Sequence, residues 1–489
     1  MAVPTAPTAP TDTHGPAAVE EQRSGRWIDD WRPEDERFWA GGGAKIARRN
    51  LIVSIFSEHI GFSIWTMWSV LVLFLPAAAY GLTPDDKFLL TAVPAFVGSF
   101  LRLPYTFAVA KFGGRNWTIV SASLLLIPSI LTAIVLKPGI SFTALILLAA
   151  LAGVGGGNFS SSMANINAFY PNRLKGSALG LNAAGGNLGV AVVQVVGLIV
   201  LAAAGGVAAS VDPRWVPGVY IPAIVVVTAC SALFMDNLTH ASNAKRAMRD
   251  VMKDPHSWIM SLLYIGTFGS FIGFSFAFGQ VLSQFLLPHH LPAGVTAATA
   301  TPAVLKAAQA ATSVDALKII FLGPLLGSIA RPAGGWLADR WGGARITLAV
   351  FVGMGAFAAL VLVASQQKSE PLFYVGFIAL FVLSGVGNGS TYKMIPAIFR
   401  AKAARSVESG ADPDREASEA RRLSSALVGV AGAIGALGGA LVQIVFRQSF
   451  LTYKNADAAY IGFICVYAVC FLVTWAVYVR KSPAKLPGV

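Results

Sequence analysis

Long apolar runs recur along the chain from about residue 51 onward, and short segments rich in polar residues, Gly or Pro separate them. A helix needs roughly 20 mostly apolar residues to cross the hydrocarbon core of a bilayer, and about twelve runs reach this length. We expect these spans to begin near residues 51, 88, 117, 142, 177, 217, 257, 315, 346, 372, 423 and 458. The pattern therefore predicts an all-α integral membrane protein with twelve transmembrane helices.

The first fifty residues do not follow this pattern. They open with Pro, Thr and Ala and continue with the charged stretch WIDDWRPEDERFW, which lacks the apolar core of a signal peptide. We expect five regions in the chain, namely a cytoplasmic tail over 1–50, a first six-helix half over 51–236, a cytoplasmic linker over 237–256, a second six-helix half over 257–480 and a cytoplasmic tail over 481–489.

Composition and charge agree with a membrane protein, since 55% of the residues are hydrophobic and only 12% are charged. The positive residues behind the net charge of +13 are distributed unequally between the loops on the two sides of the membrane. If both termini are cytoplasmic, the cytoplasmic loops hold Lys111, Arg115, Arg173, Lys175, Lys245, Arg246, Arg249, Lys253, Arg340, Arg345 and the cluster 400–422. The opposite loops offer mainly Lys87, Lys137, Arg214, Lys306, Lys368 and Lys454. This asymmetry is the positive-inside pattern, and it argues against nucleic-acid binding.

The chain contains an internal repeat. RLPYTFAVAKFGGRNWT begins at Arg102 and RPAGGWLADRWGGARIT begins at Arg331, and both the arginines and the Gly-Gly pairs at Gly113 and Gly342 are separated by 229 positions (331 − 102 and 342 − 113). GVGGG at Gly153 recurs as GVGNG further on. We therefore expect two six-helix halves in pseudo-twofold repeat, with 291–313 and 401–422 as insertions. Such repeats are typical of transporters whose substrate site lies between the halves near the bilayer midplane.

Five ionisable residues fall within predicted spans: Glu58, His59, Arg102, Arg331 and Lys393. Ionisable groups are costly in a membrane and mark functional pathways or paired sites. The two arginines occupy repeat-equivalent places, and no carboxylate in the spans is available to neutralise both. An anion from solution is thus the expected partner, although an arginine can instead bind backbone carbonyls. The planar guanidinium fork suits nitrate, nitrite or carboxylates, and its charge alone does not select among small anions.

Glycine, serine and asparagine gather where a membrane should lie, in GVGGGNFSSS from Gly153 and in LNAAGGNLG from Leu181. Small residues allow transmembrane helices to approach closely, and this packing accounts for most of the glycines. Asn158, Asn182 and Asn187 need buried hydrogen-bond partners, so we expect them near a central site.

Several of these motifs resemble those of one transporter family. GWLADRWGGAR at Gly335 resembles the loop motif of the major facilitator superfamily, although Ala110 replaces the acidic residue in the first half. The stretch 153–194 and GVGNGSTYKMIPAIF at Gly385 resemble the two signatures of the nitrate/nitrite porter family, as do WRPED at Trp31, RLPY, SLLYIGTFGSFIGFS at Ser261 and, in part, RPAGG. Relatives often carry Gly at the position of Ala183.

This resemblance implies a major facilitator fold in a bacterial cytoplasmic membrane. It implies that Arg102 and Arg331 grip the anion from opposite halves. The remaining substrate-binding positions that it implies are Phe159, Tyr264 and Phe268 as walls and Asn187 as a hydrogen-bonding group.

We expect a secondary active transporter that moves nitrate and nitrite by alternating access, most simply by exchange. Proton-coupled nitrate symport is the alternative, and Glu58 and His59 are its candidate coupling groups. Lys393 either extends toward the cytoplasm or adds positive potential to the exit path. An anion channel fits the repeat less well. A membrane oxidoreductase would need haem-ligand His pairs or Cys sets, whereas the six histidines are mostly in loops or the tail. Cys230, Cys465 and Cys470 show no metal-ligand spacing, so we expect no metal site. We also expect a monomer without cofactor or enzymatic activity.

Overall fold

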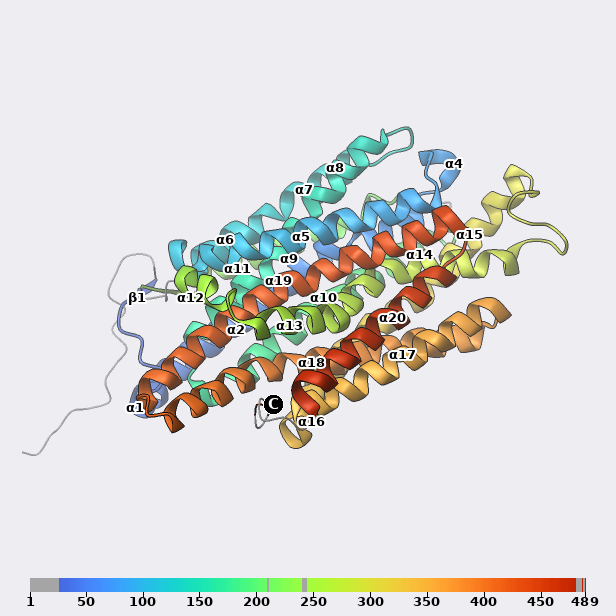
Figure 1. The fold of residues 1–489 in the computed structure, drawn as a ribbon. Coiled ribbons are helices and arrows are strands. Elements are labelled where there is room, and N and C mark those ends of the chain that lie inside the picture. The colour runs from blue at the N-terminus through green and yellow to red at the C-terminus, as the bar shows by residue number, and fades with distance from the viewer. Residues whose placement is uncertain (1–25, 209–210, 240–243, 481–485, 487–488) are drawn as a thin grey trace, which may run out of the picture.

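The computed structural model describes residues 26–208, 211–239, 244–480, 486 and 489, and these residues are mostly helical. The long helices run in a common direction, and the first and last described elements lie at the same end of the bundle (Figure 1). Residues 1–25 of the predicted N-terminal tail, 240–243 of the linker and most of the predicted tail 481–489 lie outside the described residues.

The first half contains a short strand and a series of helices. Its elements are β1 (Trp27–Ile28), α1 (Glu36–Phe38), η1 (Trp39–Gly43), α2 (Ala44–Thr66), α3 (Trp68–Phe74), α4 (Ala77–Tyr80), α5 (Pro84–Phe112), α6 (Gly114–Leu124), α7 (Leu126–Val135), α8 (Phe142–Ala152), α9 (Val154–Phe169), α10 (Asn172–Ala203) and α11 (Trp215–Phe234).

A short linker leads into the second half. The remaining elements are β2 (Asn237–Leu238), α12 (Ala244–Val251), α13 (Pro255–Tyr264), η3 (Ile265–Gly269), α14 (Ser270–His290), α15 (Pro302–Ile319), α16 (Leu322–Trp341), α17 (Gly343–Gln367), α18 (Glu370–Glu408), α19 (Pro413–Tyr453), α20 (Asp457–Thr474) and η4 (Trp475–Val479).

Eleven helical segments of the described residues are long and apolar enough to cross a membrane. The first predicted span corresponds to α2 and α3, which meet at Met67 and are not among these eleven. Glu58 and His59 make α2 more polar than the others, but Phe62 and Trp65 on the same helix are fully buried. Together with α2 and α3, the segments give the twelve spans that the apolar pattern predicts.

The two expected insertions are largely helical extensions of the spans. The Ala-rich stretch becomes helical at Pro302, because the side chain of Thr301 accepts a hydrogen bond from the backbone N–H of Val304 and proline suits the first turn of a helix. The eighth span therefore begins at 302 and not near 315. The charged stretch 401–422 continues α18 to Glu408 and starts α19 at Pro413. The first extension is rich in Ala, and the second is rich in Ala, Arg and Glu, which all favour helix.

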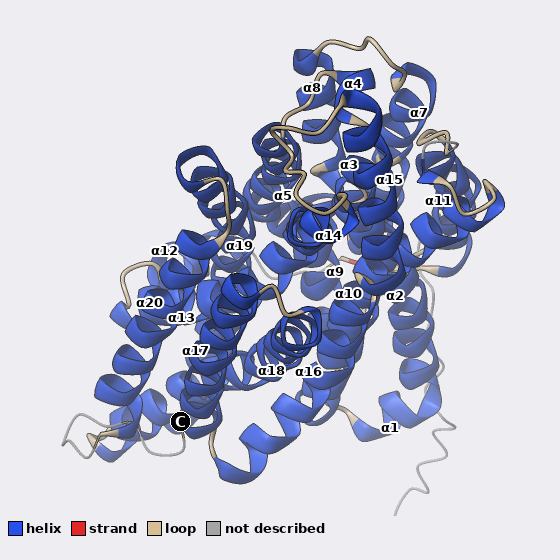
Figure 2. Ribbon diagram, turned by 90° about the vertical axis from the view of Figure 1, so that its right-hand side faces the viewer, coloured by secondary structure: helices blue, strands red, loops and turns tan. Residues whose placement is uncertain are grey.

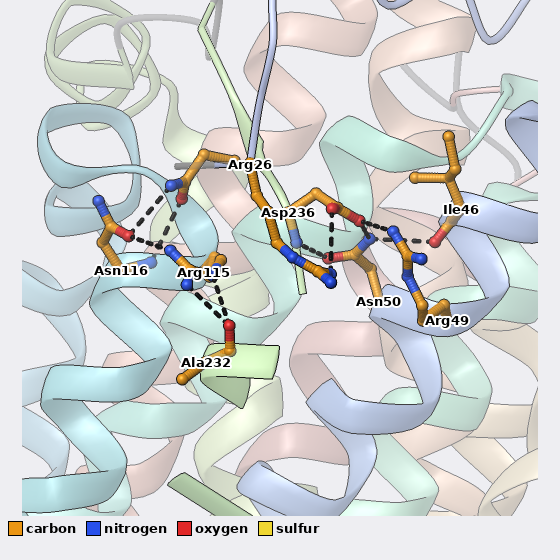
Figure 3. A network of polar contacts seen from close by, with 9 residues as sticks. Arg26, Ile46, Arg49, Asn50, Arg115, Asn116, Ala232 and Asp236 are labelled. Carbon is orange, nitrogen blue, oxygen red and sulfur yellow. Dashed lines mark hydrogen bonds and ion pairs between the residues drawn. The ribbon is translucent and has the colours of Figure 1, made fainter. Parts of the chain in front are cut away.

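Described residues of the expected N-terminal tail are packed against the first half. β1 pairs in parallel with β2, with Trp27 opposite Asn237. The Asp236 carboxylate, fully buried at the end of α11, accepts hydrogen bonds from Arg49 (2.7 Å) and Asn50 (2.8 Å) at the start of α2. Figure 3 shows this network, in which Arg26 approaches the same carboxylate. These contacts connect the first and the last span of the first half, α2 and α11, at the end of the bundle where the termini lie.

Glycines set the close crossings between neighbouring helices. A Cβ atom on Gly155 of α9 would lie 2.2 Å from the carbonyl oxygen of Gly61 on α2. In the second half, a Cβ atom on Gly385 of α18 would lie 2.0 Å from the carbonyl oxygen of Gly327 on α16. Only Gly allows such backbone approach. The halves themselves meet where α5 packs on α19 and α10 packs on α16.

Candidate functional site

Arg102 is fully buried in α5, and it bridges the two halves. Its Nε donates to the carbonyl oxygen of Gly156 on α9 (3.1 Å), and its Nη1 donates to that of Gly432 on α19 (2.9 Å). Its Nη2 has no hydrogen-bond partner. The guanidinium therefore does bind backbone carbonyls, but it keeps one donor group free.

Aromatic rings surround the Arg102 guanidinium. Its Cζ lies 4.6 Å from the ring centroid of Phe159 and 5.0 Å from that of Phe268. The rings of Trp65 (5.3 Å) and Phe62 (5.9 Å) lie slightly farther away. Cation–π attraction is strongest where water is excluded, so this environment holds a positive charge without neutralising it.

Arg331 lies in α16 of the second half and is only 5% exposed. Its Nη2 donates to the hydroxyl of Tyr264 at 3.3 Å, and its Nη1 has no partner. Its Cζ lies 5.6 Å from the ring centroid of Tyr392. Like Arg102, it holds a buried charge with one unoccupied donor group.

A stack of aromatic rings joins the two arginines. The ring of Tyr264 stacks on Phe268 (centroids 5.1 Å apart), and Phe268 stacks on Phe159 (6.1 Å). Arg102 contacts one end of this stack and Arg331 the other. Five of the six predicted substrate-binding residues are thus brought together. Within the described part of the chain, neither arginine forms an ion pair with a carboxylate.

Asn187, the sixth predicted residue, is fully buried in α10, but it makes no hydrogen bond that joins it to the arginines. Both of its side-chain amide atoms lack partners, and the same holds for Asn158 and Asn388. Buried amides without partners are costly and are normally satisfied by a ligand or water. These three side chains therefore remain available to a polar ligand.

Glu58 is fully buried in α2, where polar groups and not a basic residue contact it. Its Oε2 accepts hydrogen bonds from Asn182 (2.6 Å) and from the Ser162 hydroxyl, whereas its Oε1 has no partner. A Cβ atom on Gly186 would clash with Oε1, so glycine makes room for the carboxylate. The neighbouring His59 holds its Nδ1 3.1 Å from the carbonyl oxygen of Gly185.

Lys393 lies apart from the aromatic cluster. Its Nζ donates to both carboxylate oxygens of Asp339 at 2.9 and 2.8 Å, and both side chains are exposed. Asp339 belongs to the GWLADRWGGAR loop motif. In this conformation Lys393 ties the end of α16 to α18. No group of three or more His, Cys, Asp or Glu residues that could hold a metal ion occurs among the described residues.

Three aromatic residues of the site, Phe62, Trp65 and Tyr392, were not predicted from the sequence. Phe62 and Trp65 follow Glu58 by four and seven residues, which places all three on one helical face. That spacing could have identified them. Tyr392 directly precedes Lys393 in the second signature, and no periodic pattern of the sequence distinguishes it from the other aromatic residues.

Comparison with known proteins places the chain among transporters. Residues 60–411 match the family described as Major Facilitator Superfamily. The nitrate/nitrite transporter NarU of Salmonella typhimurium is 36% identical over 477 residues, covering 94% of this chain and 97% of the relative. NarU of Escherichia coli is 35% identical over 485 residues, covering 95% and 99%.

A third relative and the solved structures extend this picture. NarK2 of Thermus thermophilus, which is named as a probable nitrate/nitrite antiporter, is 31% identical over 482 residues, covering 94% of this chain and 98% of the relative. Among solved structures, a D-xylose–proton symporter matches with a TM-score of 0.65 over 90% of this chain and 99% of its own, at 12% identity. That likeness concerns the fold alone.

Proposed function

Because this chain belongs to the nitrate/nitrite porter family of the major facilitator superfamily, we propose that it carries nitrate and nitrite across the membrane by alternating access. The observation that supports this proposal is the pair of buried arginines, one in each half, at the two ends of one aromatic stack. Each offers one free donor group. A small planar oxyanion matches two guanidinium forks and is weakly hydrated, so its dehydration costs less than that of sulfate or phosphate.

The substrate site of this proposal comprises Arg102, Arg331, Phe159, Tyr264 and Phe268, with Asn187 as a further hydrogen-bonding group. The aromatic rings exclude water and keep both guanidinium groups charged. The arginines bind the oxygen atoms of the anion from opposite sides. Because the two arginines belong to different halves, an anion held by both links the halves while they rock. The contact of Arg102 with Gly432 of the other half adds to this link.

We favour exchange over net uptake. In the empty protein two buried positive charges lie at the two ends of the aromatic stack, and neither is paired with a carboxylate of the described residues. This arrangement disfavours passage of the unloaded site through the closed state. Either nitrate or nitrite relieves the repulsion between these charges. After one anion is released on one side of the membrane, the other can bind there and allow the site to return to the opposite side. Exchange of this kind needs no proton carrier.

Proton-coupled symport is the second candidate, and Glu58 supports it. A buried carboxylate that keeps one oxygen without a partner can accept a proton inside the protein. Its contacts are made by Asn182 and Ser162, which do not fix its charge. Transport by the Glu58→Gln variant distinguishes the two candidates.

We further propose a multi-pass monomer in a bacterial cytoplasmic membrane, with both termini in the cytoplasm and with the regions 1–50, 51–236, 237–256, 257–480 and 481–489 as its parts. The excess of Lys and Arg in the loops on the side of the termini supports this orientation.

Counterflow in proteoliposomes tests the transport proposal. Purified protein is reconstituted with nitrite inside, labelled nitrate is added outside, and initial uptake is measured against internal nitrite concentration. We expect saturable nitrate uptake that internal nitrite accelerates. Uptake that rises linearly with concentration and ignores internal nitrite would indicate a channel, and the absence of nitrate uptake at normal protein density would contradict the proposed substrate.

A further inference from the structure

A cavity with polar side chains in its walls lies at the end of the bundle opposite the termini. It has a volume of about 60 Å³, and its walls come from α3 and α5 of the first half and from α14 and α15 of the second. Seen from this end, these four helices lie next to one another (Figure 2). The volume accommodates several water molecules or one small ion. We refer to this cavity as the vestibule.

Two lysines line the vestibule, namely Lys87 from α5 and Lys306 from α15. Neither side chain forms a hydrogen bond or an ion pair within the described part of the chain, and no Asp or Glu lines the vestibule. Lys87 follows Asp85 and Asp86 at the start of α5, and neither carboxylate forms an ion pair with it within the described residues. The two halves therefore bring two lysines without ion-pair partners to one cavity.

Two buried side chains of the vestibule also lack partners. Gln280 is 2% exposed and Ser283 is 6% exposed, and both lie on α14. The Nε2 of Gln280 and the Oγ of Ser283 have no hydrogen-bond partner. These groups are an amide donor and a hydroxyl, which can both donate to an anion. Buried donors of this kind are normally satisfied, so they indicate a ligand.

The vestibule is aligned with the central site along α5. Lys87, Thr91, Ala95, Gly98 and Arg102 follow one another at intervals of four, four, three and four residues, which places them on one face of the helix. Fifteen residues separate Lys87 from Arg102, or roughly 22 Å of helix. This face contacts the other half, because the hydroxyl of Thr91 donates to Gln443 on α19 (2.9 Å).

Contacts between the halves separate the vestibule from the central site in this conformation. The Thr91–Gln443 hydrogen bond lies between Lys87 and Arg102 along α5. Near it, Phe88 stacks on Phe446 of α19 (centroids 5.7 Å apart), and Trp65 packs edge-on against Phe276 of α14 (5.8 Å). The vestibule is thus a site of its own and not a continuation of the arginine site toward the end of the bundle.

We propose that the vestibule is a peripheral binding site for a small monovalent oxyanion, where Lys87, Lys306, Gln280 and Ser283 collect the transported anion before the halves open. The proposal rests on the transport function above and adds a site that acts on anions arriving from one face only. Two lysines attract the anion electrostatically, and the amide and hydroxyl hold it. When the contacts between Thr91 and Gln443 break, the anion can move along the α5 face to Arg102.

The test compares Lys87→Gln, Lys306→Gln and the double variant with Lys137→Gln, which removes an exposed lysine at the same end of the molecule but outside the vestibule. Initial nitrate counterflow is measured in membrane vesicles of both orientations, which are sorted by protease accessibility of an N-terminal tag. We expect the double variant to raise the KM for nitrate about three- to tenfold when nitrate arrives from the face opposite the termini. The maximal rate and the KM from the other face should not change.

Salt provides a second readout. Because exposed charges are screened within about 10 Å at 0.1 M ionic strength, raising the salt concentration with an untransported salt should raise the wild-type KM toward that of the double variant. An unchanged KM in the double variant, an equal rise from both faces, or an equal rise in Lys137→Gln would each overturn the proposal. Because Lys306 is exposed on its helix, its variant keeps the test valid if Lys87→Gln fails to fold. Failure of wild-type nitrate counterflow would instead contradict the transport function.

Discussion

At the scale of single residues, anion binding depends on how many donor groups each guanidinium uses for protein partners and how many remain free. Arg102 uses Nε and Nη1 for backbone carbonyls of both halves and keeps Nη2 free. Arg331 uses Nη2 for Tyr264 and keeps Nη1 free. A lysine carries the same charge but has a single point of donation on a flexible stem. It cannot hold two protein partners in fixed directions and still present a donor to an anion.

Replacement of either arginine by lysine should therefore impair transport while the protein still folds. For Arg102→Lys and Arg331→Lys we expect nitrate counterflow to fall about 10- to 100-fold, which corresponds to the loss of one or two charge-assisted hydrogen bonds. Initial rates are normalised to the amount of reconstituted protein. Arg340→Lys, at an exposed position, is the matched control and should transport normally. Near-normal transport by one of the two variants would remove that arginine from the site.

At the scale of helices, glycine crossings determine how closely the spans approach. Gly155 and Gly385 each face a backbone carbonyl oxygen of a neighbouring helix, and backbone cannot move aside as a flexible side chain can. Gly180 on α10 has nothing within 4 Å of the position that a Cβ would take. Replacement of Gly by Ala at Gly155 and at Gly180 therefore distinguishes the cost of overpacking from the effect of helix propensity.

Gly155→Ala should destabilise the protein, and Gly180→Ala should not. Overpacking by one methyl group costs about 1–3 kcal/mol, whereas Ala in an open helical position is about 1 kcal/mol more favourable than Gly. Thermal unfolding in detergent measures both. A Gly155→Ala protein as stable as the wild type would show that α2 and α9 can separate at this crossing without cost.

Much of the helical architecture could be predicted from the sequence, because the constraint of a bilayer leaves little choice for an apolar run. The repeat predicts matching positions for Arg102 and Arg331 in the two halves. The helical extensions at Pro302 and around Glu408 were not predicted, because neither stretch forms a long apolar run, although the Ala residues of both and the charged residues of the second favour helix. The vestibule could not be predicted, since Lys87 and Lys306 are brought together only by the meeting of the two halves.

At the scale of the whole molecule, transport requires that the contacts between the halves break on one side of the site at a time. The Thr91–Gln443 hydrogen bond and the stacking of Phe88 on Phe446 close the side opposite the termini. Gln443 also donates to the carbonyl oxygen of Gly273 at 2.6 Å, so its amide is held on both sides. These contacts must open in each transport cycle.

A covalent link across this contact should stop transport reversibly. We expect the double variant Thr91→Cys/Gln443→Cys, treated with a short thiol-reactive crosslinker, to lose nitrate counterflow and to regain it after reduction. The single variants, treated in the same way, control for Cys230, Cys465 and Cys470. Full transport by protein whose crosslinking is verified by mass spectrometry would contradict alternating access through movement of these two helices.

The coupling of transport to other gradients is also a property of the whole molecule, and Glu58 allows it to be tested. Among the described residues, Glu58 is a fully buried carboxylate in a span with one oxygen atom free of partners. Glu58→Gln keeps the shape of the side chain and removes its charge and its titration. If transport is exchange, nitrite-driven nitrate counterflow should stay within about twofold of the wild type, since no proton has to cross and the changed group does not contact the anion.

Symport makes a different prediction for the same preparation, because a proton must then bind and leave a titratable group in each cycle. Glu58→Gln would abolish nitrate accumulation driven by an inward proton gradient while counterflow persisted. We expect the wild type itself to show no such accumulation when the vesicles contain no nitrite. Robust proton-driven accumulation by the wild type, lost in Glu58→Gln and retained in Glu419→Gln at the surface end of α19, would replace exchange by symport and would identify Glu58 as the coupling group.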